Sequence, residues 1–394
     1  MTKIATKTAQ EAALTDWLAE REGEMLAFLE ELVNIDSGSY DKPGVDAAGA
    51  AIAAFFAREG IACDILPLEG YGDAVRATLP TDGIGSNQPI LLMGHRDTVF
   101  PKGETERRPF TIKDGIAYGP GVADMKGGLV INAFILSAFS KLGGAPAPLI
   151  ALFTGDEEIG SPESKAVIKA EAGKARAVFN SEPGRPTGNI VTGRKGGIFF
   201  RCEVIGKAAH SGANHQDGVS AIEELARKIQ AWHALTDYEA GHTLNVGLIS
   251  GGQSVNTVAP SASCDIDLRY KDPARREEIV EAITEIADKN TLTGTSSHLT
   301  ILGEFHPLTQ SAEGERLIEN YLASGRDVGL TMEGEFSGGC ADSGLASVLG
   351  APTICGLGPV GGKVHSPEEY LEVDSIVPRA QALALTILRM GDVR

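Results

Sequence analysis

The feature that most constrains the fold is a series of short apolar segments, each followed by a polar loop. Residues 90–94, 148–153 and 177–180 have the length and composition of buried strands, and histidine or acidic side chains follow each of them. Residues 127–142 have the composition of a buried helix between the first two. Strands that alternate with helices predict an α/β sheet, and ligands of such sheets bind beyond the carboxyl ends of the strands.

The pattern changes near Lys195. Strand, helix, strand, strand, helix and strand are predicted in turn at 198–205, 221–235, 242–249, 264–270, 273–290 and 298–302. This order is that of ferredoxin-like domains. We therefore predict an inserted α+β domain at residues 195–306, within a discontinuous first domain made of residues 1–194 and 307–394. Further helices of the first domain are expected at 8–33, 47–59, 313–324 and 377–390.

Composition argues against several classes of partner. The formal net charge is −18, which is unsuited to nucleic acid or to an anionic membrane, because both attract basic surfaces. No segment approaches the ~20 apolar residues that cross a bilayer, and the first residues lack the features of a secretory signal. The five cysteines are scattered and form no C-x-x-C pair, as in reduced cytosolic proteins. We expect a soluble cytoplasmic protein that binds neither nucleic acid nor membrane.

Two motifs place histidine and aspartate next to predicted strands and helices. In GHRD, His95 and Asp97 are two residues apart on an extended segment and face the same side. A carboxylate at that spacing could hydrogen-bond the second nitrogen of a metal-bound histidine, although a solvated histidine and a capping aspartate would also explain the pair. In GPGVADMKGG, Asp124 precedes a predicted buried helix and could be its N-cap. Capping alone does not explain the glycines on both sides.

Three consecutive acids, Asp156, Glu157 and Glu158, follow the predicted strand at 148–153. Like charges so close raise one another's pKa unless a cation is present, but an exposed loop would tolerate them. Two adjacent glutamates can also divide the work of catalysis, one binding a metal and the other accepting a proton from water.

A set of five side chains predicts a metal centre. Glu182, in Ser-Glu-Pro, and His365, in Val-His-Ser, are weak indications alone, but they join His95, Asp124 and Glu158. Histidine and carboxylate ligands without cysteine suit zinc, with cobalt or manganese as alternatives. Five ligands exceed the needs of one catalytic zinc but suit two ions bridged by a carboxylate, about 3.5–4 Å apart. We therefore expect two zinc ions per chain.

The motifs GHRDTV, GPGVADMKGG, FTGDEEIGS, NSEP and VHS occur in the order and spacing of the M20 zinc peptidases, and the chain is similar to that family over nearly its whole length. It most resembles the glutamate carboxypeptidase-like members, with acetylornithine deacetylases and succinyl-diaminopimelate desuccinylases as relatives. The resemblance implies a catalytic domain with a mixed sheet flanked by helices, and an inserted domain that serves as a dimerisation lid. It also implies a homodimer that hydrolyses an amide bond next to a free carboxylate, in a small peptide or an N-acyl amino acid.

The resemblance assigns roles to the metal ligands. Asp124 would bridge both ions. His95 and Glu182 would complete one site, and Glu158 and His365 would complete the other.

The resemblance also assigns catalytic and substrate-binding roles. Glu157 would be the general base, and Asp97 would orient the histidine ligand that precedes it. His210 resembles a lid histidine that polarises the scissile carbonyl, often across a dimer, and Asn256 and Arg269 resemble residues that bind the free carboxylate of the substrate. Without the resemblance, the last three would be ordinary polar residues of the inserted domain.

The glycine-rich segment SGGCAD departs from the family pattern. It includes Gly339, which the resemblance places in the substrate site, but the family often carries Thr or Ser before the aspartate, and Cys340 and Ala341 offer no hydroxyl. The substrate pocket therefore need not follow the glutamate-specific members. Two alternatives stay open: an N-acyl amino acid deacylase with the same site, and a non-catalytic metal-dependent binding protein, against which the intact Glu157 argues.

Overall fold

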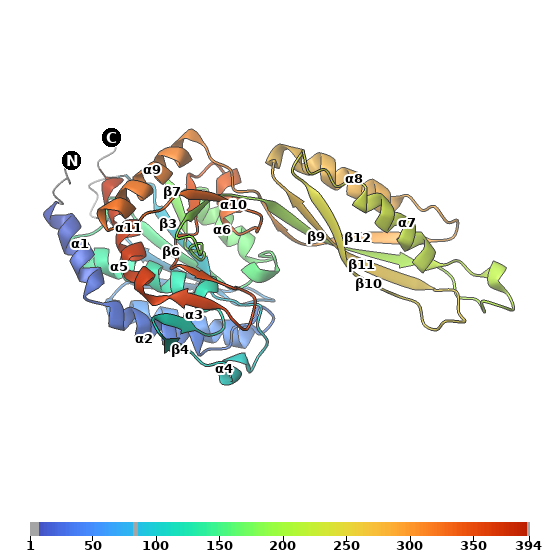
Figure 1. Ribbon diagram of the computed structural model, residues 1–394, viewed down its shortest axis with the longest axis horizontal. Helices are drawn as coiled ribbons and strands as arrows, with labels where there is room; N and C mark the ends of the chain where they lie inside the picture. Colours follow the sequence, from blue (N-terminus) through green and yellow to red (C-terminus); the bar gives the residue numbers. More distant parts are fainter. Residues whose placement is uncertain (1–7, 82–85, 392–394) are drawn as a thin grey trace. The chain divides into compact units, whose positions relative to one another are not determined.

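The computed structural model describes residues 8–81 and 86–391, and the chain divides into two compact units (Figure 1). Unit 1 comprises Met1–Gly193, Leu308–Ser337 and Leu345–Arg394, and unit 2 comprises Arg194–Pro307 and Gly338–Gly344. Each unit has its own cluster of buried apolar side chains. The role of unit 2 as a dimerisation lid stays a prediction.

Unit 1 is built on an eight-stranded mixed sheet, which confirms the predicted α/β class. In spatial order its strands are β1 (Ala62–Leu66), β2 (Ala74–Leu79), β6 (Leu149–Thr154), β3 (Ile90–His95), β7 (Ala177–Asn180), β14 (Thr353–Cys355), β8 (Ile190–Arg194) and β13 (Gly334–Ser337). The central strand β3 pairs in parallel with both β6 and β7. The carboxyl ends of these three strands therefore meet at one edge of the sheet.

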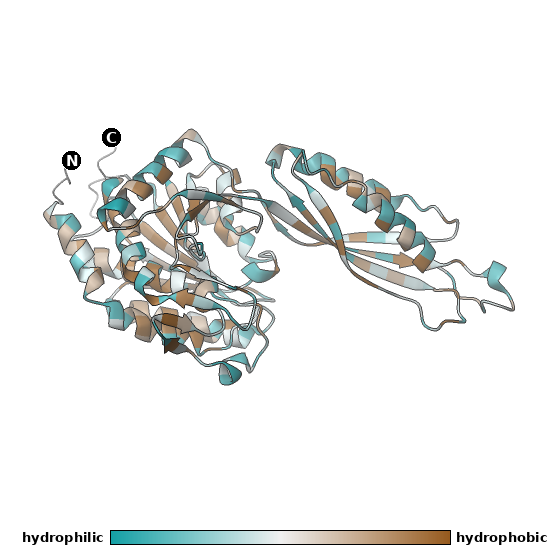
Figure 2. Ribbon diagram, in the orientation of Figure 1, coloured by the Kyte–Doolittle hydropathy of each residue, from teal (hydrophilic) through white to brown (hydrophobic). Residues whose placement is uncertain are grey.

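Helices cover both faces of this sheet because the central strands are apolar on both sides. Ile90 and Leu92 of β3 pack on one face, while Leu91 and Met93 pack on the other. The first face is covered by α1 (Ala9–Ala19), α2 (Glu22–Val33), α3 (Lys42–Glu59), α5 (Gly127–Lys141), α9 (Ala312–Asp327) and α11 (Ile376–Arg389), and the second by α6 (Ser164–Ala172) and α10 (Ser343–Val348). Figure 2 shows the strands of this sheet as largely hydrophobic.

The prediction of one helix over residues 8–33 was wrong, because α1 and α2 are separate helices. Thr8 caps α1 by accepting the N–H of Glu11. At the other end, the Arg21 guanidinium donates to the carbonyl oxygen of Trp17 at 3.0 Å and lies 3.9 Å from the centre of its ring. The long side chain of Arg21 thus closes the last turn of α1, and α2 starts afresh after it.

A second, small sheet in unit 1 brings the C-terminal region next to the segment that carries Asp124. Its strands, in spatial order, are β15 (Gly361–Gly362), β16 (Tyr370–Glu372), β5 (Ile116–Tyr118) and β4 (Thr111–Lys113), and the short helix α4 (Glu104–Arg107) precedes β4. Because β16 pairs with β5, the loop 363–369 is held beside the loop that follows β5.

Unit 2 has the predicted order β-α-β-β-α-β. Its antiparallel sheet consists, in spatial order, of β10 (Thr243–Gly251), β11 (Ser261–Tyr270), β9 (Gly196–Ile205) and β12 (Ser296–Phe305). The helices α7 (Ala221–His233) and α8 (Arg276–Asp288) lie side by side on one face of the sheet (Figure 1). Trp232 of α7 and Ile283 of α8 are buried against that face.

Among the described residues, one helical stretch, Val122–Lys141, has the length and apolar composition of a membrane span. It is wholly buried inside unit 1, and the core helix of a globular protein has the same properties. All five cysteines are free thiols.

Candidate metal centre

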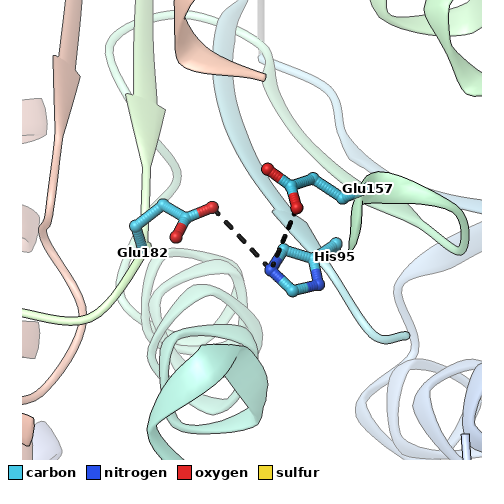
Figure 3. Close-up of side chains that lie close together, drawn as sticks. All are labelled: His95, Glu157 and Glu182. Atoms are coloured by element: carbon cyan, nitrogen blue, oxygen red, sulfur yellow. Dashed lines mark ion pairs between the residues drawn. The ribbon is translucent and has the colours of Figure 1, made fainter. Parts of the chain in front are cut away.

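Three neighbouring parallel strands present histidine and glutamate at their carboxyl ends. His95 is the last residue of β3, Glu157 and Glu158 follow β6, and Glu182 follows β7. Figure 3 shows the side chains of His95, Glu157 and Glu182 pointing toward one another. The nearest carboxylate oxygens of Glu157 and Glu182 lie 3.9 Å and 3.8 Å from Nε2 of His95.

Asp124 lies between the two histidines of the site. One of its carboxylate oxygens is 3.1 Å from Nε2 of His95, and the other is 3.4 Å from Nε2 of His365. The same nitrogen of His365 lies 3.0 Å from Glu158. Asp124 does not cap helix α5, whose N-cap residue is Lys126, so the capping alternative is excluded. The five predicted ligands therefore converge at one place in unit 1.

The donor set fits divalent metal ions. Imidazole and carboxylate groups of His95, Glu157 and Glu182, and of His95, Asp124 and Glu158, each offer ligand atoms that lie within 4.8 Å of one another. Carboxylates packed so closely repel one another unless cations neutralise them. Glu157, predicted as a base rather than a ligand, lies inside the first of these groups, so its position allows either role.

The pKa shifts describe the same crowding. Burial and the carboxylate of Asp124 raise the pKa of Glu158 to about 7. Hydrogen bonds to Asp124 and Glu158 raise the pKa of His365 to about 10. Burial would raise the pKa of Asp124, but hydrogen bonds from His365 and His95 outweigh it and hold the pKa below its usual range. These opposite shifts reflect carboxylates and imidazoles crowded at one place, where bound cations would neutralise the carboxylates.

The three acids after β6 are not an exposed loop. Asp156 and Glu157 are buried, and Asp156 accepts the backbone N–H groups of Glu163 and Ser164 at 2.8 Å and 3.1 Å, at the start of α6. Asp156 therefore anchors the loop, while the following two glutamates face the site.

Asp97 supports both the histidine and the glutamates. It is fully buried. Its backbone oxygen lies 3.0 Å from Nδ1 of His95, which leaves Nε2 of that ring to face the site. Its carboxylate oxygens accept the N–H groups of Glu157 and Glu158, both at 3.1 Å, and the hydroxyl of Ser39 at 2.7 Å.

Two glycines allow helix α5 to approach the strand ends. A Cβ atom at Gly128 would lie 1.8 Å from the carbonyl oxygen of Ser181, and one at Gly94 would lie 2.3 Å from the side chain of Met125. Glycine is therefore required at these two positions, and Gly128 is one of the glycines beside Asp124 that capping did not explain.

Glu369 was not predicted from the sequence. It is buried, and its carboxylate accepts three backbone N–H groups: those of Ala123 and Asp124 at 2.9 Å each, and that of Gly121 at 3.0 Å. Burial raises the pKa of Glu369 to about 7. In the sequence, only its position four residues after His365 associates Glu369 with the predicted ligands. Glu369 closes the loop that carries Asp124.

His210 and Asn256 lie in adjoining loops of unit 2. The N–H of Ser211 donates to the backbone oxygen of Asn256 at 3.0 Å. Nδ1 of His210 accepts the N–H groups of Gly212 and Ala213, both at 3.1 Å. The neutral ring therefore carries its proton on Nε2 and can donate it in a hydrogen bond.

Arg269, on β11, is held by its neighbours in unit 2. Its Nε donates to Asp267 at 2.8 Å, its guanidinium lies 5.3 Å from the ring centre of Phe199, and it contacts the thiol of Cys340, next to Gly339. The segment that departs from the family pattern thus lies against this arginine.

The structure separates Arg269 from the two loop residues of unit 2. His210 bridges to Thr257, just before the start of β11 at Ser261, whereas Arg269 is near its end. At about 3.3 Å per residue, the strand between Ser261 and Arg269 spans about 26 Å. Arg269 and His210 of one chain therefore cannot contact the same small molecule.

Comparison with known proteins decides the family. The sequence profile of peptidase family M20/M25/M40 matches residues 91–389. The chain belongs to this family. Carboxypeptidase G2 of Pseudomonas sp. (strain RS-16) is 30% identical over 372 residues, which cover 92% of this chain and 88% of that protein. The acetylornithine deacetylase of Salmonella typhimurium is 27% identical over 383 residues, which cover 90% of this chain and 95% of that protein.

Solved structures of peptidases share the fold. A tripeptidase from Staphylococcus aureus superposes with a TM-score of 0.75 at 22% identity, covering 94% of this M20 chain and 99% of that one. An M20 metallo-carboxypeptidase from Sulfolobus solfataricus gives a TM-score of 0.75 at 19% identity, covering 93% and 99%. The predicted family and fold are thus confirmed, and the chain is an M20-family hydrolase.

Proposed function

We propose that this M20 protein is a di-zinc hydrolase that cleaves an amide bond next to a free carboxylate, releasing a C-terminal amino acid from a small peptide or an N-acyl amino acid. The position of Asp124 carries the proposal, because its two oxygens face two different histidines, as expected of a carboxylate shared by two ions. His95 and Glu182 would hold one ion with Asp124, and Glu158 and His365 the other.

When bound, the ions supply Lewis-acid activation of water and of the scissile carbonyl, a chemistry that cobalt or manganese would also support. Glu157 accepts the proton of the attacking water and returns it to the leaving nitrogen. The backbone of Glu157 is fixed by Asp97, whose carboxylate accepts its N–H at 3.1 Å. This hydrogen bond keeps Glu157 beside the five proposed ligands, although Glu157 is not itself one of them.

In this proposal unit 2 recognises the substrate. Arg269 and Asn256 bind its free carboxylate, and Nε2–H of His210 donates to the oxyanion that develops on the carbonyl oxygen. Since about 26 Å of strand separates Arg269 from the adjoining loops of His210 and Asn256, each active site takes Arg269 from one chain of a homodimer and His210 with Asn256 from the other.

The edge strand of unit 2 supports such a dimer. β10 is the last strand of its sheet, and Leu248 and Ile249 on it are 66% and 62% exposed. An unpaired, apolar edge is suited to pairing with the same edge of a second copy. We expect this dimer in the cytoplasm, where the five thiols would stay reduced.

An N-acyl amino acid deacylase with the same centre is the second candidate, since acetylornithine deacetylases are similar over 90% of the chain. A non-catalytic binding protein would have no use for Glu157 beside a complete ligand set.

Metal analysis and one variant test the proposal. Zinc-reconstituted protein should contain two ions per chain by elemental analysis. Glu157→Gln should keep both ions and lose about 10²–10⁴-fold in kcat on N-acyl amino acids. Saturation at one ion would refute the two-metal mechanism, and near wild-type turnover of the metal-loaded variant would refute Glu157 as the base.

A further inference from the structure

A cavity of about 620 Å³ lies beside the candidate metal centre, entirely within unit 1. Its walls are residues 38–41 and 98–102, with Glu158 and Ile159 at one end. Glu158 also faces His365 at 3.0 Å, so the cavity begins at the proposed metal ligands. Its volume is that of small-molecule sites, which hold about 300–1,000 Å³.

The lining of this cavity is mainly apolar. Its lining residues include Tyr40, Val99, Phe100, Pro101 and Ile159. Tyr40 is 83% exposed and Val99 is 43% exposed, although residues of these types are more often covered. Apolar side chains that gather beside polar catalytic groups indicate a binding site for an apolar group.

Two polar side chains of the lining, those of Lys102 and Ser39, already have partners. Nζ of Lys102 lies 3.3 Å from Asp41, and the hydroxyl of Ser39 donates to Asp97 at 2.7 Å. Lys102, the one cationic residue of the lining, is thus already paired. An anionic occupant would therefore find no free cation in the lining to pair with.

We propose that this cavity binds the acyl half of the substrate and selects large apolar or aromatic acyl groups over acetyl and succinyl. The proposal rests on the proposed function, which assigns the carboxylate of the leaving amino acid to Arg269 and Asn256 in unit 2. The group on the other side of the scissile carbonyl then falls to unit 1, where the cavity starts at Glu158. An acetyl group would fill little of the volume, and a succinyl group would bring a second negative charge.

An acyl series on the zinc-loaded enzyme tests the proposal. With one L-amino acid as the constant leaving group, kcat/KM is measured for acetyl, succinyl, hexanoyl and benzoyl derivatives. Benzoyl should exceed acetyl by about 10–200-fold, the range that a hydrophobic pocket achieves, with hexanoyl between them and succinyl no better than acetyl.

Two matched variants locate the effect. Tyr40→Ala removes an exposed ring from the cavity, and Tyr238→Ala removes an equally exposed ring, 84% against 83%, from unit 2. Tyr40→Ala should lower the benzoyl to acetyl ratio at least about threefold, and Tyr238→Ala should leave the ratio at its wild-type value. Val99→Lys should raise the succinyl to benzoyl ratio, because it adds a cation to the wall. Equal thermal unfolding midpoints would show that each variant is folded.

The outcomes separate the cavity from the proposed function. If no N-acyl amino acid or dipeptide is hydrolysed, the proposed function fails and the cavity proposal with it. If hydrolysis occurs but kcat/KM is flat across the series or highest for acetyl or succinyl, the cavity proposal alone is overturned. It is also overturned if Tyr40→Ala and Tyr238→Ala change the benzoyl to acetyl ratio equally.

Discussion

Substitution of Glu369 would show whether a buried carboxylate that is not itself a proposed metal ligand holds the proposed ligand Asp124 in place. Its two oxygens accept three N–H groups of the loop 121–124. Glutamine has the same shape, but only one of its two terminal atoms accepts hydrogen bonds. With its oxygen toward Ala123 and Asp124, Glu369→Gln keeps two of the three bonds and turns its NH₂ group toward the N–H of Gly121.

The expected loss of unfolding free energy follows from the number of N–H groups that each variant leaves without an acceptor. One buried N–H without an acceptor costs about 1–3 kcal/mol, so the free energy of unfolding of Glu369→Gln should fall by about that amount. Glu369→Ala leaves all three groups without an acceptor and should cost about 3 kcal/mol or more, since neighbouring losses do not add fully. Because the loop carries Asp124, metal affinity should fall by about 10–100-fold, as it does when the partners of ligands are removed.

Urea unfolding of the metal-free protein measures the first effect, and competition with a chromophoric chelator measures the second. The neighbouring Glu368 is a matched control, because it is exposed and pairs with Lys363 at 2.9 Å on the surface. Glu368→Gln should change the unfolding free energy by no more than about 1 kcal/mol.

Two results would refute the reasoning. If Glu369→Gln and Glu368→Gln behave alike in both assays, the three bonds do not matter. If Glu369→Gln lowers the unfolding free energy but leaves the metal dissociation constant unchanged, then Glu369 stabilises the fold without positioning Asp124.

Three further predictions concern the support of the ligands, the dimer and the stability of unit 2. Asp97→Asn should weaken metal binding about 10–100-fold in the chelator assay, because an NH₂ group, which only donates, replaces one of the oxygens that accept the N–H groups of Glu157 and Glu158. An unchanged metal affinity would contradict this role of Asp97. Glu157→Ala and His210→Ala should each be nearly inactive. After random subunit exchange their mixture should regain about a quarter of wild-type activity, because half of the dimers are mixed and each mixed dimer has one intact site of two. If exchange is proven and no activity returns, His210 acts in the site of its own chain or has no part in catalysis. Burial would raise the pKa of Glu224, but the N–H and hydroxyl of Thr291 with other donors outweigh it and lower the pKa to about 2 from 4.5. This lowered pKa stabilises the fold above pH 4.5, and the stabilisation is lost as the pH falls from 4.5 toward 2. The difference in unfolding free energy between wild type and Glu224→Gln should therefore be largest near pH 7 and shrink below pH 4.5, and a difference independent of pH would contradict the assignment.

Three of the proposed ligands could be found from the sequence because each follows a predicted strand. His95, Glu158 and Glu182 each follow a short apolar run, and parallel pairing of those runs brings their ends together. The same locality explains why the other predicted helices and strands lie near their observed bounds, although short strands such as β1, β2, β13 and β14 were not predicted. It also explains the failure at Arg21, where one side chain folded back on Trp17 ends a helix inside a continuous helical pattern.

Glu369 shows that contacts between distant parts of the chain are not visible in local sequence patterns. Its N–H partner at Asp124 is 245 residues away in the chain, and nothing in the sequence near either residue marks the pairing. The roles that the resemblance assigns to Arg269 and His210 likewise do not indicate their separation, which the length of β11 determines.

The cavity beside the metal centre has the same long-range origin. Its two walls meet because Gly38 and Thr98 form a parallel bridge, in which the N–H of Ser39 donates to the oxygen of Thr98 at 3.2 Å and the N–H of Thr98 to that of Ser37 at 2.8 Å. These are backbone bonds, so the side chains of Tyr40 and Val99 can change without breaking the pairing or moving a ligand. The metal centre and the acyl preference are therefore separable: residues at strand ends fix the chemistry, and the side chains of two paired loops set which acyl group reaches it.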